Sequence, residues 1–317
     1  MGPTSNAISV FLGCGVLECH VEHESPDLVS REIHAGQITM KVGGRAASAA
    51  MAYHQAGGGP LITGLITGLD PAGKLVADMA VDEIPGLRRI ATASGTSYST
   101  IGAENASVVQ PKIDELATLA FVKPWIIGNA RIVVAPQMSE LSPVMKRLVK
   151  APPTQTILML SRSQCEERKA TLGFIKNCAM VHLDAINLAL LTEKNDVVSG
   201  MNVLREQGVH DIIVLDDKRG ITAFLDGKWH HQPAFRVDSA TRPGLADESS
   251  MGCFLAARDQ GQTNEESLRL AAAASGMAIA NIKLRNRGLN ELVAFATVTP
   301  TFPYAPAPHE TLVDVIK

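Results

Sequence analysis

Short apolar runs alternate along this chain with longer segments in which apolar positions recur at helical spacing. The pattern is most regular after residue 130. Strands are predicted there at residues 131–135, 156–160, 179–183 and 211–215, and helices at 140–149, 166–176 and 200–207. Apolar strands that alternate with helices are typical of a parallel sheet that is covered by helices on both faces.

The first half of the chain follows the same rhythm, with two interruptions. Strands are predicted at 7–12 and 61–66, and helices at 43–55 and 71–81. Residues 14–42 and 88–110 are more polar and have β character. We therefore predict a single domain over 1–317 with an α/β fold. It consists of a mostly parallel sheet with helices on both faces and a small β lid formed by 14–42 and 88–110.

The last third of the chain is predicted to be mostly helical after a hairpin. Two strands at 221–225 and 229–232 flank the turn Asp226-Gly227-Lys228, which is typical of a β-hairpin. Thr263 and Glu266 have the spacing of a capping box, which predicts a long helix from there to about residue 283.

The composition restricts the class of protein. Hydrophobic residues make up 46% of the 317 residues and charged residues 19%, which is typical of a globular protein. The formal net charge of −3 provides no basic field for nucleic acid. The five cysteines are scattered, as in a reducing cytoplasm, and we expect a cytoplasmic protein. We expect no signal peptide and no membrane span, because the start of the chain lacks a basic n-region and no apolar run is long enough.

The segment Gly244-Leu245-Ala246-Asp247 precedes an apolar helical run. A helix that begins there would direct its free N–H groups towards an anion, with the Asp247 carboxylate beside it. Phosphoryl transfer needs both features, namely donors for the transferring group and a base for the attacking hydroxyl. The simpler interpretation, favoured by this segment alone, is an aspartate that caps a helix.

Glycines mark a second candidate site. Gly43 and Gly44 open a helix of small residues, and Gly64, Gly68, Asp70 and Gly73 follow the next strand. Glycine permits tight turns and a close approach of the backbone to a ligand. Ordinary turn chemistry explains any one of these glycines equally well.

Taken together, these segments resemble the ribokinase (PfkB) carbohydrate kinase family. The family carries a Gly-Gly pair that opens a helix, then G-x-x-x-G-x-D-x-x-G, and near its C-terminus G-A-G-D before a helix. The stretch 232–238 also resembles the approach to the last motif in sulfofructose-kinase-like members. The resemblance extends over roughly residues 8–288.

The resemblance implies ATP-dependent phosphorylation of a hydroxyl group on a sugar or a similar small molecule, with ATP and Mg²⁺ as cofactors. It implies that Asp247 is the general base and that the backbone of Gly244, Leu245 and Ala246 forms the anion hole. The implied substrate-binding residues are Glu18, Gly43, Gly44 and Ser48. The residues implied to lie near the nucleotide or its metal are Asp184, Asn187, Asp217, Gly220 and Ser275. Dimers that form through the lid are common in the family, so a homodimer is possible.

Several departures from the family pattern keep a second hypothesis open. Ala246 replaces a glycine of the anion hole, and Thr241-Arg242-Pro243 replaces D-T-T. The N-x-x-E motif falls on Asp184 and Asn187 with acid and amide exchanged. The alternative is a relative that binds ligands without catalysis. A Rossmann-type oxidoreductase is disfavoured, because Gly13-Cys14-Gly15 lacks the third glycine of the dinucleotide-binding motif.

Overall fold

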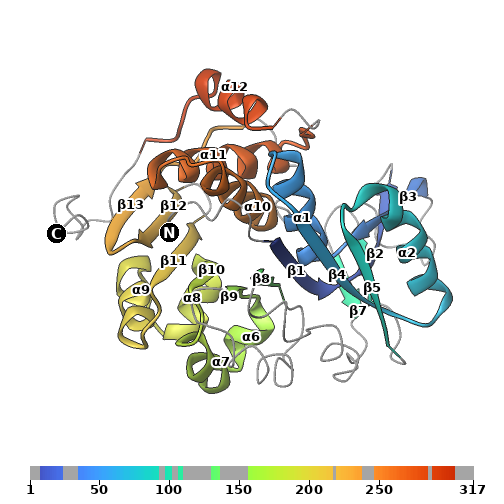
Figure 1. Ribbon diagram of the computed structural model, residues 1–317, viewed down its shortest axis with the longest axis horizontal. Coiled ribbons are helices and arrows are strands. Elements are labelled where there is room, and N and C mark those ends of the chain that lie inside the picture. Colours follow the sequence, from blue (N-terminus) through green and yellow to red (C-terminus); the bar gives the residue numbers. More distant parts are fainter. Residues whose placement is uncertain are drawn as a thin grey trace.

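The protein has two sheets, and helices cover both faces of the larger one (Figure 1). The computed structural model describes residues 8–23, 35–92, 97–101, 106–109, 130–135, 156–216, 219–237, 246–284 and 288–303. Within these ranges, no helix combines the length and the apolar character needed to cross a membrane. The predicted helix at 140–149 lies outside them.

The larger sheet has nine strands in the order β13-β12-β11-β10-β9-β8-β1-β4-β5. Its strands are β1 (Ile8–Cys14), β4 (Leu61–Gly68), β5 (Leu87–Thr92), β8 (Ala130–Val134), β9 (Thr156–Met159), β10 (Met180–Asp184), β11 (Asp211–Asp216), β12 (Gly220–Leu225) and β13 (Lys228–Gln232). All neighbours from β11 to β5 pair in parallel, and β12 and β13 form the predicted antiparallel hairpin at one edge. The predicted mostly parallel sheet is confirmed.

Successive side chains of the strands enter two hydrophobic clusters, one on each face of this sheet. Phe11 packs on the face that carries α1, α10 and α11, whereas Val10 and Leu12 pack on the face that carries α6 to α9. The helices are α1 (Arg45–Gln55), α2 (Pro71–Glu83), α6 (Arg162–Glu166), α7 (Arg168–Ile175), α8 (Ala185–Thr192), α9 (Val197–Glu206), α10 (Ala246–Asp259), α11 (Asn264–Ile279) and α12 (Asn290–Val298). The alternation explains why the central strands of the sheet are mostly apolar on both faces.

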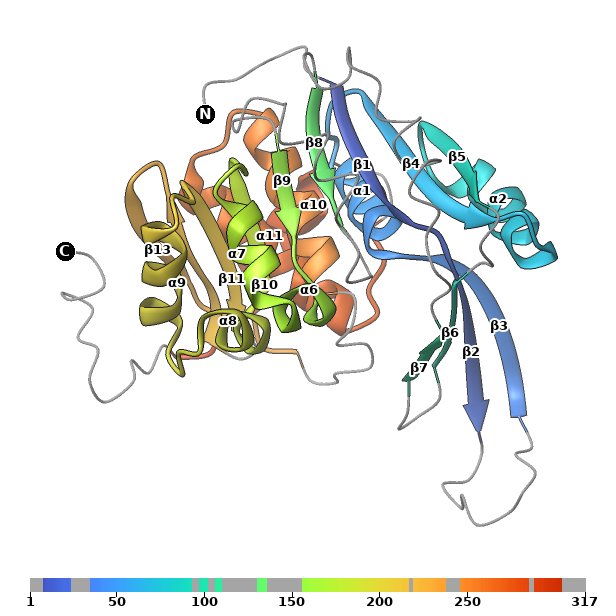
Figure 2. The ribbon, with the colours of Figure 1, turned by 90° about the horizontal axis from the view of Figure 1, so that it is seen from below.

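The smaller sheet contains four strands in the order β3-β2-β6-β7. They are β2 (Val16–His23), β3 (Ala35–Gly43), β6 (Ser97–Ile101) and β7 (Ala106–Val109), and the sheet projects beyond the carboxyl ends of the large sheet (Figure 2). Both predicted lid segments contribute to it. Residues 88–92, which the sequence assigned to the lid, lie instead in β5, which pairs in parallel with β4 after the crossover through α2.

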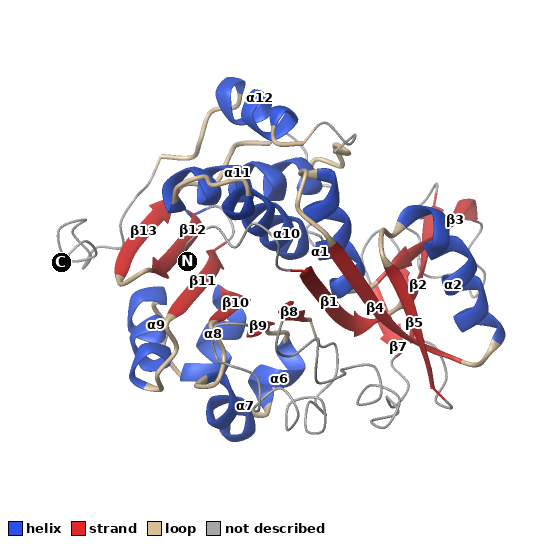
Figure 3. Ribbon diagram, in the orientation of Figure 1, coloured by secondary structure: helices blue, strands red, loops and turns tan. Residues whose placement is uncertain are grey.

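Helices α1 and α10 lie against each other on one face of the large sheet (Figure 3). Small residues make this packing close, since α1 buries Ala46, Ala49 and Ala52, and a β-carbon at Gly252 of α10 would overlap the carbonyl oxygen of Ala49. The first residues of both helices therefore lie at the same end of the sheet.

Candidate active site

The first turn of α10 carries two adjacent carboxylates. Asp247 is half-buried and Glu248 is buried. Acidic residues at this position interact favourably with the positive end of the helix dipole. Of the three residues predicted to form the anion hole, Ala246 begins α10, whereas Gly244 and Leu245 lie outside the described residues.

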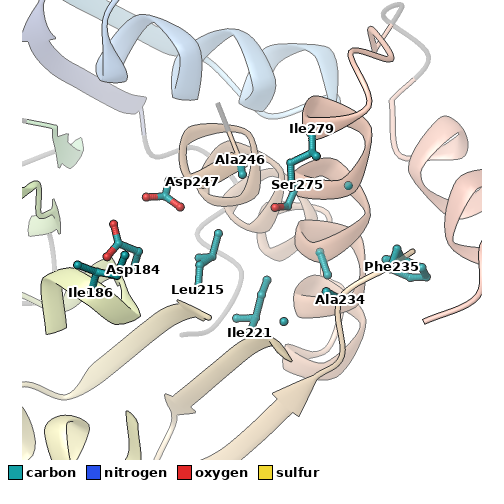
Figure 4. Close-up of a pocket in the computed structure, with 13 residues that line it drawn as sticks. Asp184, Ile186, Leu215, Ile221, Ala234, Phe235, Ala246, Asp247, Ser275 and Ile279 are labelled. Atoms are coloured by element: carbon teal, nitrogen blue, oxygen red, sulfur yellow. The ribbon is translucent and has the colours of Figure 1, made fainter. Parts of the chain in front are cut away.

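Asp247 faces a cavity of about 340 Å³ between α10, α11 and the strand ends of the large sheet. Figure 4 shows the carboxylates of Asp247 and Asp184 on one side of this cavity and Ser275 of α11 on the other. The remaining walls are mostly apolar. They are formed by Ile186, Leu215, Gly220, Ile221, Ala234, Phe235, Ala246, Ala272, Gly276 and Ile279.

The surroundings of Asp247 raise its pKa to about 7. Burial is the largest cause, because it disfavours the charged form, and the neighbouring Glu248 carboxylate acts in the same direction. The Arg45 guanidinium lowers the pKa, and Asp184 raises it by a smaller amount. A carboxyl group in these surroundings gains and loses its proton near neutral pH.

Arg45, the first residue of α1, connects the site to two other elements. Its Nε donates a hydrogen bond of 2.8 Å to Oε1 of Glu248, and its Nη1 donates one of 3.0 Å to the carbonyl oxygen of Met159 at the end of β9. The side chains of Arg45 and Glu248 are only 12% and 6% exposed. In the sequence, Arg45 directly follows Gly43-Gly44 and Glu248 directly follows Asp247, but no local pattern pairs the two residues.

Asp184 caps the N-terminus of α8. Its Oδ1 accepts a hydrogen bond of 2.7 Å from the backbone N–H of Asn187, and its Oδ2 accepts one of 2.7 Å from Nδ2 of the same residue. The exchanged acid and amide thus bond to each other. Asp184 lines the cavity, whereas Asn187 is buried beside it and does not.

Gly220 and Ser275 line the same cavity as Asp247, and Asp217 lies outside the described residues. Gly220 has a φ of 99°, and a β-carbon there would overlap the carbonyl oxygen of Gln232. Only glycine fits this turn without strain.

Two of the four predicted substrate-binding residues, Glu18 and Ser48, line a different hollow. Glu18 of β2 and Ser48 of α1 line a groove of about 430 Å³ that Ser249 of α10 also reaches. The groove is further lined by Lys41, Val42, Met51, Ala52, Gln55, Glu83, Ala274, Met277, Ala278, Asn281, Ile282, Lys283 and Leu284.

The Gly43-Gly44 pair forms the turn from β3 into α1. The side chain of Glu18 lies across Gly43 so closely that a β-carbon there would overlap its carboxylate. Gly44 has a φ of 109°, and a β-carbon there would overlap the carbonyl oxygen of Cys14. The structure therefore brings Glu18 and the glycine turn together beside β1.

Asp247 lines the cavity and not the groove, although Ser249 lines the groove. Residues two positions apart on a helix point about 200° apart, so the first turn of α10 presents a side chain to each hollow. The helix α11 does the same, with Ser275 on the cavity side and Met277 on the groove side. The two hollows thus share the walls α10 and α11.

Comparison with known proteins gives matches only among solved structures. No protein-family model matches the sequence, and no curated protein matches it. Ribokinase from Thermotoga maritima superposes with a TM-score of 0.72 at 15% identity, over 92% of this chain and 99% of that chain. Arabidopsis thaliana ribokinase, complexed with ribose and ATP, gives a TM-score of 0.71 at 18% identity, over 93% and 99%.

The tetrameric inhibited form of phosphofructokinase-2 from Escherichia coli gives a TM-score of 0.72 at 15% identity, over 92% of this chain and 98% of that chain. The chain has the ribokinase-like fold. This confirms the predicted fold class over nearly the whole chain, including the small sheet. In this ribokinase-like fold, Asp247 lies in the first turn of α10, which packs against the helix that follows the Gly43-Gly44 turn.

Proposed function

We propose that the protein transfers a phosphoryl group from ATP to a hydroxyl group of a sugar or a sugar-like small molecule, with Asp247 as the general base. One observation carries the proposal: the Asp247 carboxyl group faces the cavity at the start of α10, and its pKa is raised to about 7. A general base is most effective when its pKa lies near the working pH. The Arabidopsis neighbour, whose structure contains ribose and ATP, supports the same substrate classes.

The cavity beside Asp247 is the proposed nucleotide site. Its apolar walls, including Leu215, Ile221 and Phe235, suit the faces of a nucleobase, and Ser275 offers a hydroxyl group for hydrogen bonding. In the described part of the chain, no three His, Cys, Asp or Glu side chains form a metal-binding group. Mg²⁺ is usually held by one or two carboxylates together with phosphates and water, so Asp184 at the cavity wall suits an ion that arrives with the nucleotide.

The groove beside Glu18 is proposed to hold the body of the sugar, whose reacting hydroxyl group must extend to Asp247 at the start of α10, a helix that the groove shares with the cavity. A carboxylate and a hydroxyl group, here from Glu18 and Ser48, can bond sugar hydroxyls as acceptor and donor. The turn at Gly43 and Gly44 leaves backbone close to that carboxylate without a side chain in the way.

A specific observation also favours the alternative of a non-catalytic ligand-binding relative. Among the described residues, the carboxylates of Glu248 and Asp184 raise the pKa of Asp247, and Arg45 is the cation that lowers it. Negative charge in the cavity repels a polyphosphate unless a cation accompanies it. The kinase and the non-catalytic relative differ in whether ATP is converted to ADP, and one experiment can measure this.

The deciding experiment is an ADP-release assay with Mg²⁺-ATP and a panel of sugars and polyols, combined with thermal-shift measurements on the same ligands. We expect ADP release with at least one sugar, and we expect Asp247→Asn to lower kcat by about 10²–10⁴-fold while ATP still stabilises the protein. Stabilisation by a sugar or a nucleotide without any ADP release would establish the alternative instead.

A further inference from the structure

Arg45 lies beside two neighbouring carboxylates but bonds only one of them among the described residues. Its Nε binds Glu248, while its charge also acts on Asp247. Its Nη1 is bound to the carbonyl oxygen of Met159, which fixes the guanidinium at the end of β9. The choice of Glu248 leaves Asp247 directed at the cavity (Figure 4).

The pair of Arg45 and Glu248 is poorly explained by stability alone. Glu248 Oε2 is buried and has no hydrogen-bond partner in the described part of the chain. A buried acceptor without a partner is destabilising, and a buried ion pair often contributes less than the apolar side chains that could replace it. The pair therefore calls for a role other than holding α1 against α10, which Ala49 and Gly252 already do.

We propose that Glu248 is a positioning residue that holds the Arg45 guanidinium away from Asp247, so that Asp247 faces the cavity as an unpaired carboxyl group. The inference rests on the proposed function, in which Asp247 must accept a proton from the substrate hydroxyl. An arginine bonded directly to Asp247 would stabilise its charged form and occupy the oxygen that has to take the proton.

The charges around Asp247 support this role. The groups that act on it are Glu248 on its own helix, Arg45 from α1 and Asp184 from the end of β10. His182 of β10 also lies near Arg45, but burial lowers its pKa to about 3, so it is neutral. When Glu248 loses its charge, Asp247 and Asp184 are the acids left to attract Arg45. Asp184 already uses both oxygens to bond Asn187, which makes Asp247 the better partner.

The kinetic test compares Glu248→Gln with the double variant Glu248→Gln/Arg45→Gln. Glu248→Gln should lower kcat by about 10–100-fold, change the KM for ATP by less than about 3-fold and move the acidic limb of the pH profile to lower pH. The double variant should regain at least about 5-fold in kcat, because it removes the arginine that captures Asp247. Glu266→Gln, which breaks the Glu266–Arg269 pair on the far half of α11, is the matched control and should change none of these values.

Two outcomes would overturn the proposal. If the pair is only structural, the double variant will be no more active than Glu248→Gln. If Glu248→Gln does not fold, Arg45→Gln and the double variant carry the test. These two variants should have equal kcat, because without Arg45 there is no guanidinium for Glu248 to hold. A lower kcat for the double variant than for Arg45→Gln would refute the positioning role of Glu248.

A readout without catalysis separates this proposal from the proposed function. In the wild type, the raised pKa of Asp247 makes the folded state lose stability as the pH rises from about 4 to about 7. Glu248→Gln should remove most of this fall in stability between pH 4 and pH 7. The variant Asp247→Asn/Glu248→Gln, which lacks the Asp247 carboxyl group, serves as the reference for the pH dependence that remains. If the wild type has no kinase activity but its pH dependence of stability still differs from that of Glu248→Gln, the proposed kinase function is refuted and the positioning role of Glu248 stands. A pH dependence that is unchanged by Glu248→Gln would refute the positioning in an active kinase.

Discussion

The protonation of a single carboxyl group, that of Asp247, links the candidate site to the stability of the fold. A carboxyl group whose pKa is raised in the folded state binds more protons there than in the unfolded chain, so stability falls as the pH rises through the interval between the two values. We expect Asp247→Asn to be more stable than the wild type by about 1–3 kcal/mol at pH 8 and by much less at pH 4. Urea unfolding at the two pH values measures this. An equal effect at both would show that burial does not control this carboxyl group.

The adjacent glycines Gly43 and Gly44 should respond differently to the same substitution. Gly44→Ala places a side chain at a φ of 109° and against the backbone of Cys14, so we expect a loss of about 2–4 kcal/mol. The three atoms nearest to a β-carbon at Gly43 all belong to the side chain of Glu18, which can rotate away, so we expect a change within about 1 kcal/mol.

The two alanine variants therefore separate stability from binding. Gly43→Ala should keep the fold but displace the Glu18 carboxylate, and it should weaken stabilisation by any sugar that binds in the groove. Chemical unfolding and sugar thermal shifts on the two variants test this. Equal losses of stability would contradict the difference in their surroundings.

At the scale of elements, the contact between α1 and α10 depends on the absence of a side chain at Gly252. An alanine there would overlap the carbonyl oxygen of Ala49 and push the helices apart, so we expect a loss of about 1–3 kcal/mol. Gly173 in α7 is the matched control, because no atom lies within 4 Å of a β-carbon at that exposed position. Gly173→Ala should raise stability by about 0.5–1 kcal/mol through helix propensity. If both alanine variants changed stability in the same direction, the close contact at Gly252 would not be what sets its response.

Most elements were predictable because strands buried on both faces are mostly apolar. The sequence missed α8, which begins directly after β10, so that one apolar stretch contains both a strand and a helix. It also missed α6, because the helix predicted at 166–176 corresponds to α7, and the two helices are separated at Glu167 by a backbone turn without glycine or proline. The place of β5 depends on pairing with β4, which no local pattern specifies.

The sequence predicted the separate motifs of the candidate site but not how they are arranged in space. The glycine turn and Asp247 each have a local signal, and the structure places Asp184, Gly220 and Ser275 in one cavity with Asp247. The pair of Arg45 and Glu248 spans 203 positions of the sequence, so only the packing of α1 on α10 reveals it. The division into a cavity and a groove depends on the rotation of α10, which a motif does not fix.

At the scale of the whole molecule, the small sheet bears on assembly. Its edge strands are β3 and β7, and Met40 of β3 is 50% exposed. Exposed strand edges readily pair with a second chain. We expect a homodimer through this sheet, visible by light scattering as about twice the chain mass.

Met40→Lys should shift this dimer towards monomers, because the two-fold axis brings the new charges close together. Val81→Lys on α2 is the control, since Val81 is also an exposed apolar residue but lies outside the small sheet. A monomer at all concentrations, or an equal effect of both lysines, would contradict assembly through this sheet.

The strand order of the large sheet also implies an order of folding. From β8 to β13 each strand pairs with the next one in the sequence. By contrast, β1 pairs with β8, and the chain segment between Ile8 and its partner Ala130 contains the whole small sheet. Closing a long loop costs more chain entropy than joining neighbours, so non-local pairs form late. We expect pulsed hydrogen exchange during refolding to protect the amides of β10, β11 and β12 before those of β1. The cavity and the groove, which need the turn after β3 and the helix after β13, would then be the last parts of the protein to exist.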